Sequence, residues 1–200
     1  MALVGNNLGF YYQKDRWIFK NISLAVAPGE VLGLSGYSGC GKTTLARVLA
    51  GYVSSREGRV SLDGGTWGKG KFRPVQLIYQ HPEKAIDPKW RMGEVLTEAY
   101  KPEPDILEAF EIREEWLKRW PIELSGGELQ RFCIVRALHP QTKYIIADEM
   151  TTMLDAITQA KIWHSLLNIC QSRKLGLIVV SHEKSLLGRV CDRMYEVGHG

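Results

Sequence analysis

Residues 36–43 constrain this chain more than any other segment. Their sequence, GYSGCGKT, matches the phosphate-binding loop pattern G-x-x-x-x-G-K-[ST]. The apolar run 31–35 before the loop reads as a buried strand. Residues 44–51 after it, with spaced apolar side chains and a closing glycine, read as a helix. A strand, a glycine-rich loop and a helix in this order form a site for nucleotide phosphates. We therefore predict that the chain binds a nucleoside triphosphate.

The predicted loop offers several kinds of ligand group. Backbone N–H groups and the helix N-terminus face the phosphates. The Lys42 ammonium reaches the β- and γ-phosphates, and the Thr43 hydroxyl completes the shell of a Mg²⁺ ion. The residues expected to bind the ATP phosphates are Gly36, Ser38, Gly39, Cys40, Gly41, Lys42, Thr43 and Thr44.

A second candidate anion site lies at residues 124–128, LSGGE, just before the apolar-periodic stretch 132–138. Ser125 is an expected helix N-cap, and the two glycines behind it leave backbone N–H groups uncovered. The helix dipole adds about 0.3–1 kcal/mol of preference for negative charge. A capped helix alone would also explain these residues, but the phosphate loop upstream favours a nucleotide-related role.

Length and composition limit the architecture and the compartment. The chain has 200 residues, 44% of them hydrophobic, which suits one globular unit with a sizeable core and an inserted subdomain. No run approaches the roughly 18–20 apolar residues of a membrane span, and no signal peptide is recognisable. Four scattered cysteines suggest neither zinc nor disulfides. We expect a soluble intracellular protein. Thiol reagents could modify Cys40 inside the loop, with loss of binding.

Charge does not favour a nucleic-acid partner. The formal net charge is only +4, and no run of five or six like charges occurs. The densest basic patch contains Lys69, Lys71 and Arg73, with Trp67 and Phe72 between them. Because this stretch is rich in glycine, we interpret it as a solvated turn between two strands and predict no nucleic-acid binding.

Strand and helix patterns predict an α/β fold: a P-loop NTPase core with a mostly parallel sheet, an antiparallel β flank and an inserted α-helical subdomain. Residues 1–80 and 143–200 form the core and flank, and residues 81–142 form the helical subdomain. Short helices are expected at 92–100, 105–111 and 113–119, and a longer one at 156–171. Ligands of such sheets bind at the carboxyl ends of the strands. The polar residues that follow predicted strands are Gln80, Asp148, Glu149 and His182.

Six elements, in order, resemble the ATP-binding cassette (ABC) family over nearly the whole chain, which implies a single ABC nucleotide-binding domain over residues 1–200. Besides the phosphate loop, Walker A, they are a Q-loop at Gln80, the signature L-S-G-G-[QE]-x-Q-R at 124–131, a Walker B strand at 144–149, a D-loop at 153–155 and a switch histidine at His182.

The resemblance implies an ATPase that uses ATP and Mg²⁺. Glu149 would be the general base that activates the attacking water, and Asp148 would hold Mg²⁺ through water. Gln80 would contact Mg²⁺ or the attacking water, and His182 would sense the γ-phosphate. The sequence LGFYY at 8–12 is similar to the family's aromatic loop, which makes Tyr12 the candidate for stacking on adenine; Tyr11 remains an alternative.

The family works as a dimer of cassettes. Signature residues of one subunit then cover the nucleotide held by Lys42 of the other, and Asp155 lies along the interface. The signature residues are Ser125, Gly126, Gly127 and Glu128. The second cassette could be an identical chain or a related one.

Residues 79–88, YQHPEKAIDP, resemble the oligopeptide and nickel importer subgroup. The resemblance implies permease membrane subunits, an indirect link to an extracytoplasmic solute-binding protein, and a cytoplasmic position at the inner face of the cell membrane. Peptides, nickel or metal chelates are the implied cargo. Alternatives are non-transport ABC ATPases of translation or DNA repair, although one cassette without long heptads argues against both.

Some residues depart from the family pattern. Met150 replaces a usual proline, Thr152-Met153 replaces the common Ser-Ala, and Glu128 replaces the commoner glutamine. None of these changes removes a catalytic group, so hydrolysis remains expected. Trp90 and Trp116 could be exposed and receive the permease's coupling helices, or they could belong to the core.

Overall fold

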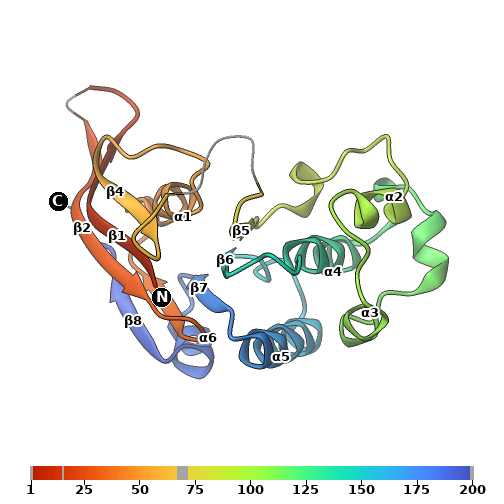
Figure 1. Ribbon diagram of the computed structural model, residues 1–200. Helices are drawn as coiled ribbons and strands as arrows, with labels where there is room; N and C mark the ends of the chain where they lie inside the picture. Colours follow the sequence, from red (N-terminus) through yellow and green to blue (C-terminus); the bar gives the residue numbers. More distant parts are fainter. Residues whose placement is uncertain (1, 15, 67–71, 199–200) are drawn as a thin grey trace. The chain divides into compact units, whose positions relative to one another are not determined.

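The computed structural model of the protein describes residues 2–14, 16–66 and 72–198 (Figure 1). The chain forms two compact units. The first consists of Met1–Leu77, Thr142–Asp148 and Cys170–Gly200, and the second of Ile78–Gln141 and Glu149–Ile169. Residues 149–169, which the sequence patterns assign to the core, thus belong by their contacts to the same unit as the segment predicted to be helical. The basic stretch with Trp67, Lys69 and Lys71 lies outside the described residues.

A small antiparallel sheet forms one part of the first unit. Its strand order is β2-β1-β4, with bounds β1 Leu3–Tyr11, β2 Trp17–Val26 and β4 Glu57–Leu62. In the second half of β2 the buried residues are Ile22, Leu24 and Val26, alternating with exposed ones, as expected for a strand with one face in the core. This sheet is the antiparallel flank that the sequence predicts.

A five-stranded sheet has the order β5-β6-β7-β3-β8, and its pairs β6–β7, β7–β3 and β3–β8 are parallel. Every residue of β6 and β7 is buried, which is typical of parallel strands covered on both faces. Because the strands are parallel, their carboxyl ends meet at one edge, where Val180 pairs with both Leu34 and Asp148. The bounds are β3 Val31–Ser35, β5 Val75–Ile78, β6 Tyr144–Asp148, β7 Gly176–Val180 and β8 Arg193–Glu196.

Two short helices belong wholly to the first unit: α1 Lys42–Leu49 and α6 Lys184–Val190. Helix α1 begins two residues earlier than the apolar pattern predicts, because Gly41 already forms its N-cap in a left-handed conformation. The helix buries Leu45, Ala46, Val48 and Leu49.

The second unit is helical. Its elements are η1 Pro82–Lys84, α2 Met92–Thr97, α3 Pro104–Ala109, η2 Glu114–Lys118, η3 Pro121–Glu123, α4 Gly126–Ala137 and most of α5 Ala156–Arg173. Helix α3 ends at Ala109, followed by Glu111 at φ +50°, so it is shorter than predicted. The helix expected at 113–119 is a 3₁₀ helix, in a segment closed by Pro121.

The two tryptophans left open by the sequence have different environments. Trp116 is buried and packs against Phe132 of α4, with 6.4 Å between the ring centroids, so it belongs to the core of the second unit. Trp90 is 38% exposed. Within the residues that the structure describes, no helix is long and apolar enough to cross a membrane.

Candidate nucleotide-binding site

The loop between β3 and α1 depends on glycines at its two ends. Gly36 has φ +148°, and a Cβ there would lie 2.8 Å from the Val197 carbonyl oxygen. Gly41 has φ +96°, and a Cβ there would lie 2.6 Å from the Ile18 side chain. Any other residue would strain the backbone and clash at both positions. The two glycines therefore fix the backbone path of the loop, whose N–H groups are the expected phosphate donors.

The Lys42 side chain lies inside this loop. Its residue is only 7% exposed, and Nζ donates hydrogen bonds to the carbonyl oxygens of Gly36 and Tyr37, at 2.8 and 3.0 Å. Cys40 is fully buried, with Sγ 3.9 Å from the same Nζ. Burial corrects the expectation that thiol reagents reach Cys40. The charged group inside the loop is the Lys42 ammonium.

Thr43 and Asp148 come together at the edge of the sheet. The Thr43 hydroxyl donates a hydrogen bond of 3.2 Å to the Asp148 carboxylate, which ends strand β6 and is nearly buried. A hydroxyl and a carboxylate are hard oxygen ligands of the kind that Mg²⁺ takes beside water and phosphate. These two residues therefore fit a magnesium ion, whose positive charge would polarise the phosphate oxygens.

The two candidate adenine-stacking residues differ in what their rings contact. Tyr11 lies edge-on to Trp17 and under the Arg56 guanidinium, at 4.9 and 5.1 Å from the ring centroid. Tyr12 is 57% exposed, and its hydroxyl oxygen lies 3.4 Å from Thr44 Oγ1 at the start of α1. The Tyr12 ring is thus beside the phosphate loop and accessible.

His182 follows strand β7, the neighbour of the strand that leads into the loop. The preceding Ser181 is buried, and its N–H donates to the Leu34 carbonyl of β3 at 3.4 Å. The His182 side chain itself is exposed. The switch candidate therefore stands at the same sheet edge as Asp148, because β6 and β7 end in register.

In the second unit, Gln80 and Glu149 are in direct contact although 69 positions separate them in the sequence. Gln80 Nε2 donates to Glu149 Oε2 and to Thr152 Oγ1, both at 3.2 Å. Glu149 has φ +50°, a left-handed conformation that a non-glycine residue adopts only when its surroundings impose it. The structure thus joins the two residues predicted to handle the attacking water.

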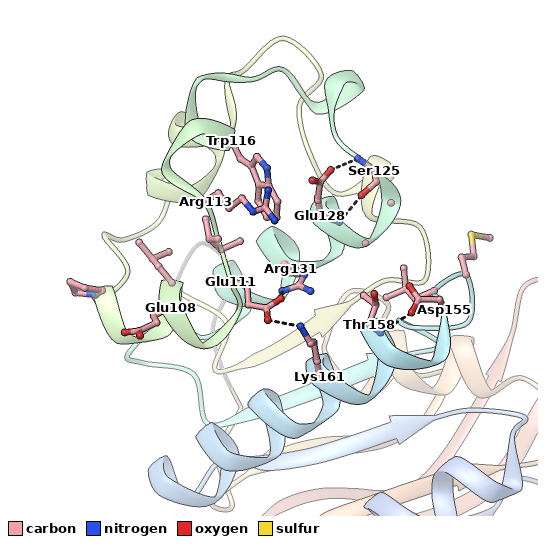
Figure 2. Close-up of a pocket in the computed structure, with 17 residues that line it drawn as sticks. Glu108, Glu111, Arg113, Trp116, Ser125, Glu128, Arg131, Asp155, Thr158 and Lys161 are labelled. Carbon is pink, nitrogen blue, oxygen red and sulfur yellow. Dashed lines mark hydrogen bonds and ion pairs between the residues drawn. The ribbon is translucent and has the colours of Figure 1, made fainter.

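The signature segment begins helix α4 with a reciprocal cap. Ser125 Oγ accepts from the Glu128 N–H at 3.3 Å, and the Glu128 carboxylate accepts from the Ser125 N–H at 2.7 Å (Figure 2). The first N–H groups of a helix have no partner within it, so Gly126 and Gly127 leave donors at this end. The glutamate that departs from the common pattern therefore has a structural role.

Signature and D-loop residues line one pocket of about 1080 Å³ within the second unit. Asp155 also caps α5, because its Oδ1 accepts from the N–H groups of Ile157 and Thr158 at 3.0 Å. A hydrogen bond with the Thr158 side chain contributes most to lowering the pKa of the Asp155 carboxyl, and the bonds from the backbone N–H groups lower it further. The structure thereby brings together Ser125, Gly126, Gly127, Glu128 and Asp155.

An ion cluster in the same pocket has no counterpart in the sequence predictions. Glu111 accepts hydrogen bonds from Lys161 Nζ and Arg131 Nη1, both at 2.8 Å (Figure 2). These two bonds, the one from Lys161 first, lower the pKa of the Glu111 carboxyl. Of the three residues only Arg131 lies in a motif. Glu111 is 20 positions from Arg131 and 50 positions from Lys161, and no spacing rule relates residues so far apart. The cluster connects the segment that follows α3 to α4 and α5.

The other cysteines are unsuited to chemistry. Burial raises the pKa of Cys133, Cys170 and Cys191 to about 12 each. A thiol must ionise to act as a nucleophile or metal ligand. The described residues also contain no group of three or more histidine, cysteine or acidic side chains that could by themselves hold a metal ion.

Fold and loop together define a P-loop nucleotide-binding domain. The family model described as ABC transporter matches residues 19–152. The nickel import ATP-binding protein NikE of Escherichia coli K12 is 31% identical over 202 residues, covering 92% of this chain and 75% of NikE. The oligopeptide transport ATP-binding protein OppF of Haemophilus influenzae is 30% identical over 214 residues, covering 96% of this chain and 64% of OppF.

Solved structures have the same fold. A dimeric post-hydrolysis state of the ATP-binding cassette MJ0796 bound to ADP and Pi has a TM-score of 0.82 at 25% identity, covering 98% of this chain and 94% of that one. An ATP-binding subunit of an ABC transporter has a TM-score of 0.83 at 23% identity, covering 98% and 85%. The chain belongs to the ABC transporter family. It is an ATP-binding subunit with the ATPase fold of that family.

Proposed function

We propose that this subunit hydrolyses ATP to drive an importer, through permease subunits in the cell membrane. The observation that carries the proposal is the hydrogen bond between Gln80 and Glu149. It joins an amide to the carboxylate that directly follows Asp148 in the sequence. NikE and OppF, both named for import, supply the transport context.

Hydrolysis is an in-line attack of water on the γ-phosphate, in which positioning and charge stabilisation do most of the catalysis. Glu149 accepts the proton of the water while the Gln80 amide fixes the direction of its carboxylate. The Lys42 ammonium binds β- and γ-phosphate oxygens, and His182 donates to a γ-phosphate oxygen. Thr43 and Asp148 would hold Mg²⁺, which would supply positive charge to the phosphate oxygens, and Gln80 would contact the ion or the attacking water.

A complete site requires a second cassette. The Ser125 hydroxyl and the Gly126 and Gly127 N–H groups of one subunit contact the phosphates held by Lys42 of the other. The Glu128 carboxylate supports this role by holding the Ser125 backbone, since it takes the Ser125 N–H. Asp155 lies along the interface and links the two sites. The partner is an identical chain or a related cassette.

The transported solute is a peptide, nickel or a metal chelate, in keeping with the two relatives. The subunit then sits at the cytoplasmic face of the cell membrane, on permease subunits that receive solute from an extracytoplasmic binding protein. A non-transport role in translation or DNA repair remains the alternative, and no observation on the described residues favours it.

Affinity capture tests the transport proposal. The tagged Glu149→Gln chain, incubated with Mg-ATP and detergent-solubilised membranes of the native host, is expected to retain polytopic membrane proteins. The Lys42→Ala chain is the matched control that should lose any ATP-dependent partner. Retention of ribosomes or DNA in place of membrane proteins would contradict the importer assignment.

Replacing Tyr12 with alanine is expected to raise KM for ATP by about tenfold, since stacking on a nucleobase contributes about 1–3 kcal/mol. Turnover at saturating ATP should change little, because the phosphates are held by other residues. Tyr12→Phe is the matched control: it keeps the ring, loses the contact with Thr44, and should stay near wild type. Steady-state kinetics of both variants and of Tyr11→Ala make the comparison. A larger effect at Tyr11 would reassign the stacking residue.

A further inference from the structure

The turn that follows strand β6 presents Glu149 in a strained conformation. Its φ of +50° is unfavourable for any residue with a Cβ. Backbone strain of this kind persists only where contacts with neighbouring residues outweigh it. The contacts that hold Glu149 in place therefore bear on the direction of its carboxylate. The described residues supply such contacts on two sides of the turn.

On one side, the turn is closed by Thr152. Its N–H and its hydroxyl both donate to the Glu149 carbonyl oxygen, at 3.3 and 3.1 Å. The same hydroxyl oxygen accepts from the Gln80 amide. Gln80 thus touches both ends of the four-residue turn, at the Glu149 carboxylate and at Thr152.

On the other side, Thr151 is the point of attachment to helix α5. Its hydroxyl oxygen accepts from Gln159 Nε2 at 2.9 Å and from Trp163 Nε1 at 3.1 Å, so both lone pairs are used. Thr151 is 2% exposed and Trp163 4% exposed. Gln159 and Trp163 are one helical turn apart, on the same face of α5, so both donors point at one oxygen.

We propose that Thr151 is a positioning residue for hydrolysis, and that the Gln159 amide and the Trp163 indole act through it to hold the turn that presents Glu149. The inference rests on the proposed role of Glu149 as the base. It adds a function to Trp163 beyond the apolar stripe of α5, because the indole N–H reaches the turn while the ring packs in the core.

A simpler explanation is that the Thr151 bonds only satisfy buried polar groups. Thr151, Gln159 and Trp163 would then affect stability without affecting the conformation of Glu149. One observable that separates the two explanations is the backbone conformation of Glu149 when the hydroxyl of residue 151 is removed. This observable needs no nucleotide and no partner subunit.

The test compares Thr151→Val, which keeps the shape and removes the hydroxyl, with Thr151→Ser, which keeps the hydroxyl. The ¹³Cα and ¹³Cβ chemical shifts of Glu149 in the full chain report its φ. We expect the valine variant to leave the left-handed region and the serine variant to stay in it. If Thr151→Val does not fold, the double variant Gln159→Met and Trp163→Phe removes both donors instead. Exposed His164 on α5, changed to alanine, is the control.

Kinetics provide the second measurement. Thr151→Val should lower kcat for ATP about tenfold and change KM less than twofold. Displacing a catalytic group lowers the rate of the chemical step but leaves the groups that bind ATP in place. In the Glu149→Gln background the same substitution should change single-turnover hydrolysis less than twofold, since the group being positioned is already gone.

Unchanged Glu149 shifts in Thr151→Val, or an equal loss of rate in both backgrounds, would overturn the inference. Failure of the proposed function gives a different result: Glu149→Gln alone would then hydrolyse ATP at the wild-type rate, whatever residue 151 does.

Discussion

The Glu149→Gln variant is expected to bind ATP normally and to lose turnover by a factor of about 10² to 10⁴, the usual contribution of a positioned general base. An amide cannot take the proton of the attacking water. Its oxygen can still accept from Gln80, so the 3.2 Å contact and the geometry of the turn should survive. Phosphate release under multiple turnover, together with fluorescent-nucleotide binding, measures both properties.

The control for this variant is Glu114→Gln, which removes an exposed carboxylate from η2 of the same unit. Its hydrolysis should match that of the wild type. Near-normal hydrolysis by Glu149→Gln would instead reject Glu149 as the base. Weakened ATP binding in Glu149→Gln would mean that the carboxylate has a binding role.

Lys42→Ala is expected to weaken ATP binding roughly 100-fold, because two charge-assisted hydrogen bonds of about 1.5 kcal/mol each are lost. The change also leaves the carbonyl oxygens of Gly36 and Tyr37 without the donor that they share. Isothermal titration with Mg-ATP measures the effect, and a thermal melt checks that the loop variant is folded.

Lys143→Ala, at an exposed position just before β6, is the matched control for loss of one positive charge from the first unit. It should bind ATP like the wild type. Equal weakening in both variants would indicate a general charge effect and would contradict a specific role for Lys42 in phosphate binding.

Features that depend on neighbouring residues could be predicted from the sequence. The phosphate loop needs glycines at Gly36 and Gly41 for its own backbone. Strand β7 and all of β6 except its last residue, Asp148, lack charged side chains because both faces of these strands are covered. The antiparallel flank and the parallel sheet followed from these patterns. Helix ends were less accurate, as at α3, which ends at Ala109, two residues before the left-handed Glu111.

Contacts between distant positions could not be predicted. Nothing in the spacing relates Gln80 to Thr152, or Glu111 to Lys161, since hydrogen bonds between side chains 50 to 72 positions apart leave no periodic pattern. Helical spacing assigned Trp163 to the core, and its ring is indeed buried. The spacing could not predict that the indole N–H donates to Thr151. The ring contacts of Tyr11 and Tyr12 likewise could not be predicted, and the assignment of adenine stacking to Tyr12 stays a prediction.

Steady-state ATP hydrolysis by the wild-type chain, measured against protein concentration with light scattering alongside, tests the central claim most directly. If the second subunit is an identical chain, activity per mole should rise with concentration, in step with an ATP-dependent doubling of mass. If the second subunit is a related cassette, this chain alone should bind ATP and remain an inactive monomer. Constant activity per mole from a monomer would contradict this account, because a single chain would then contain the whole site.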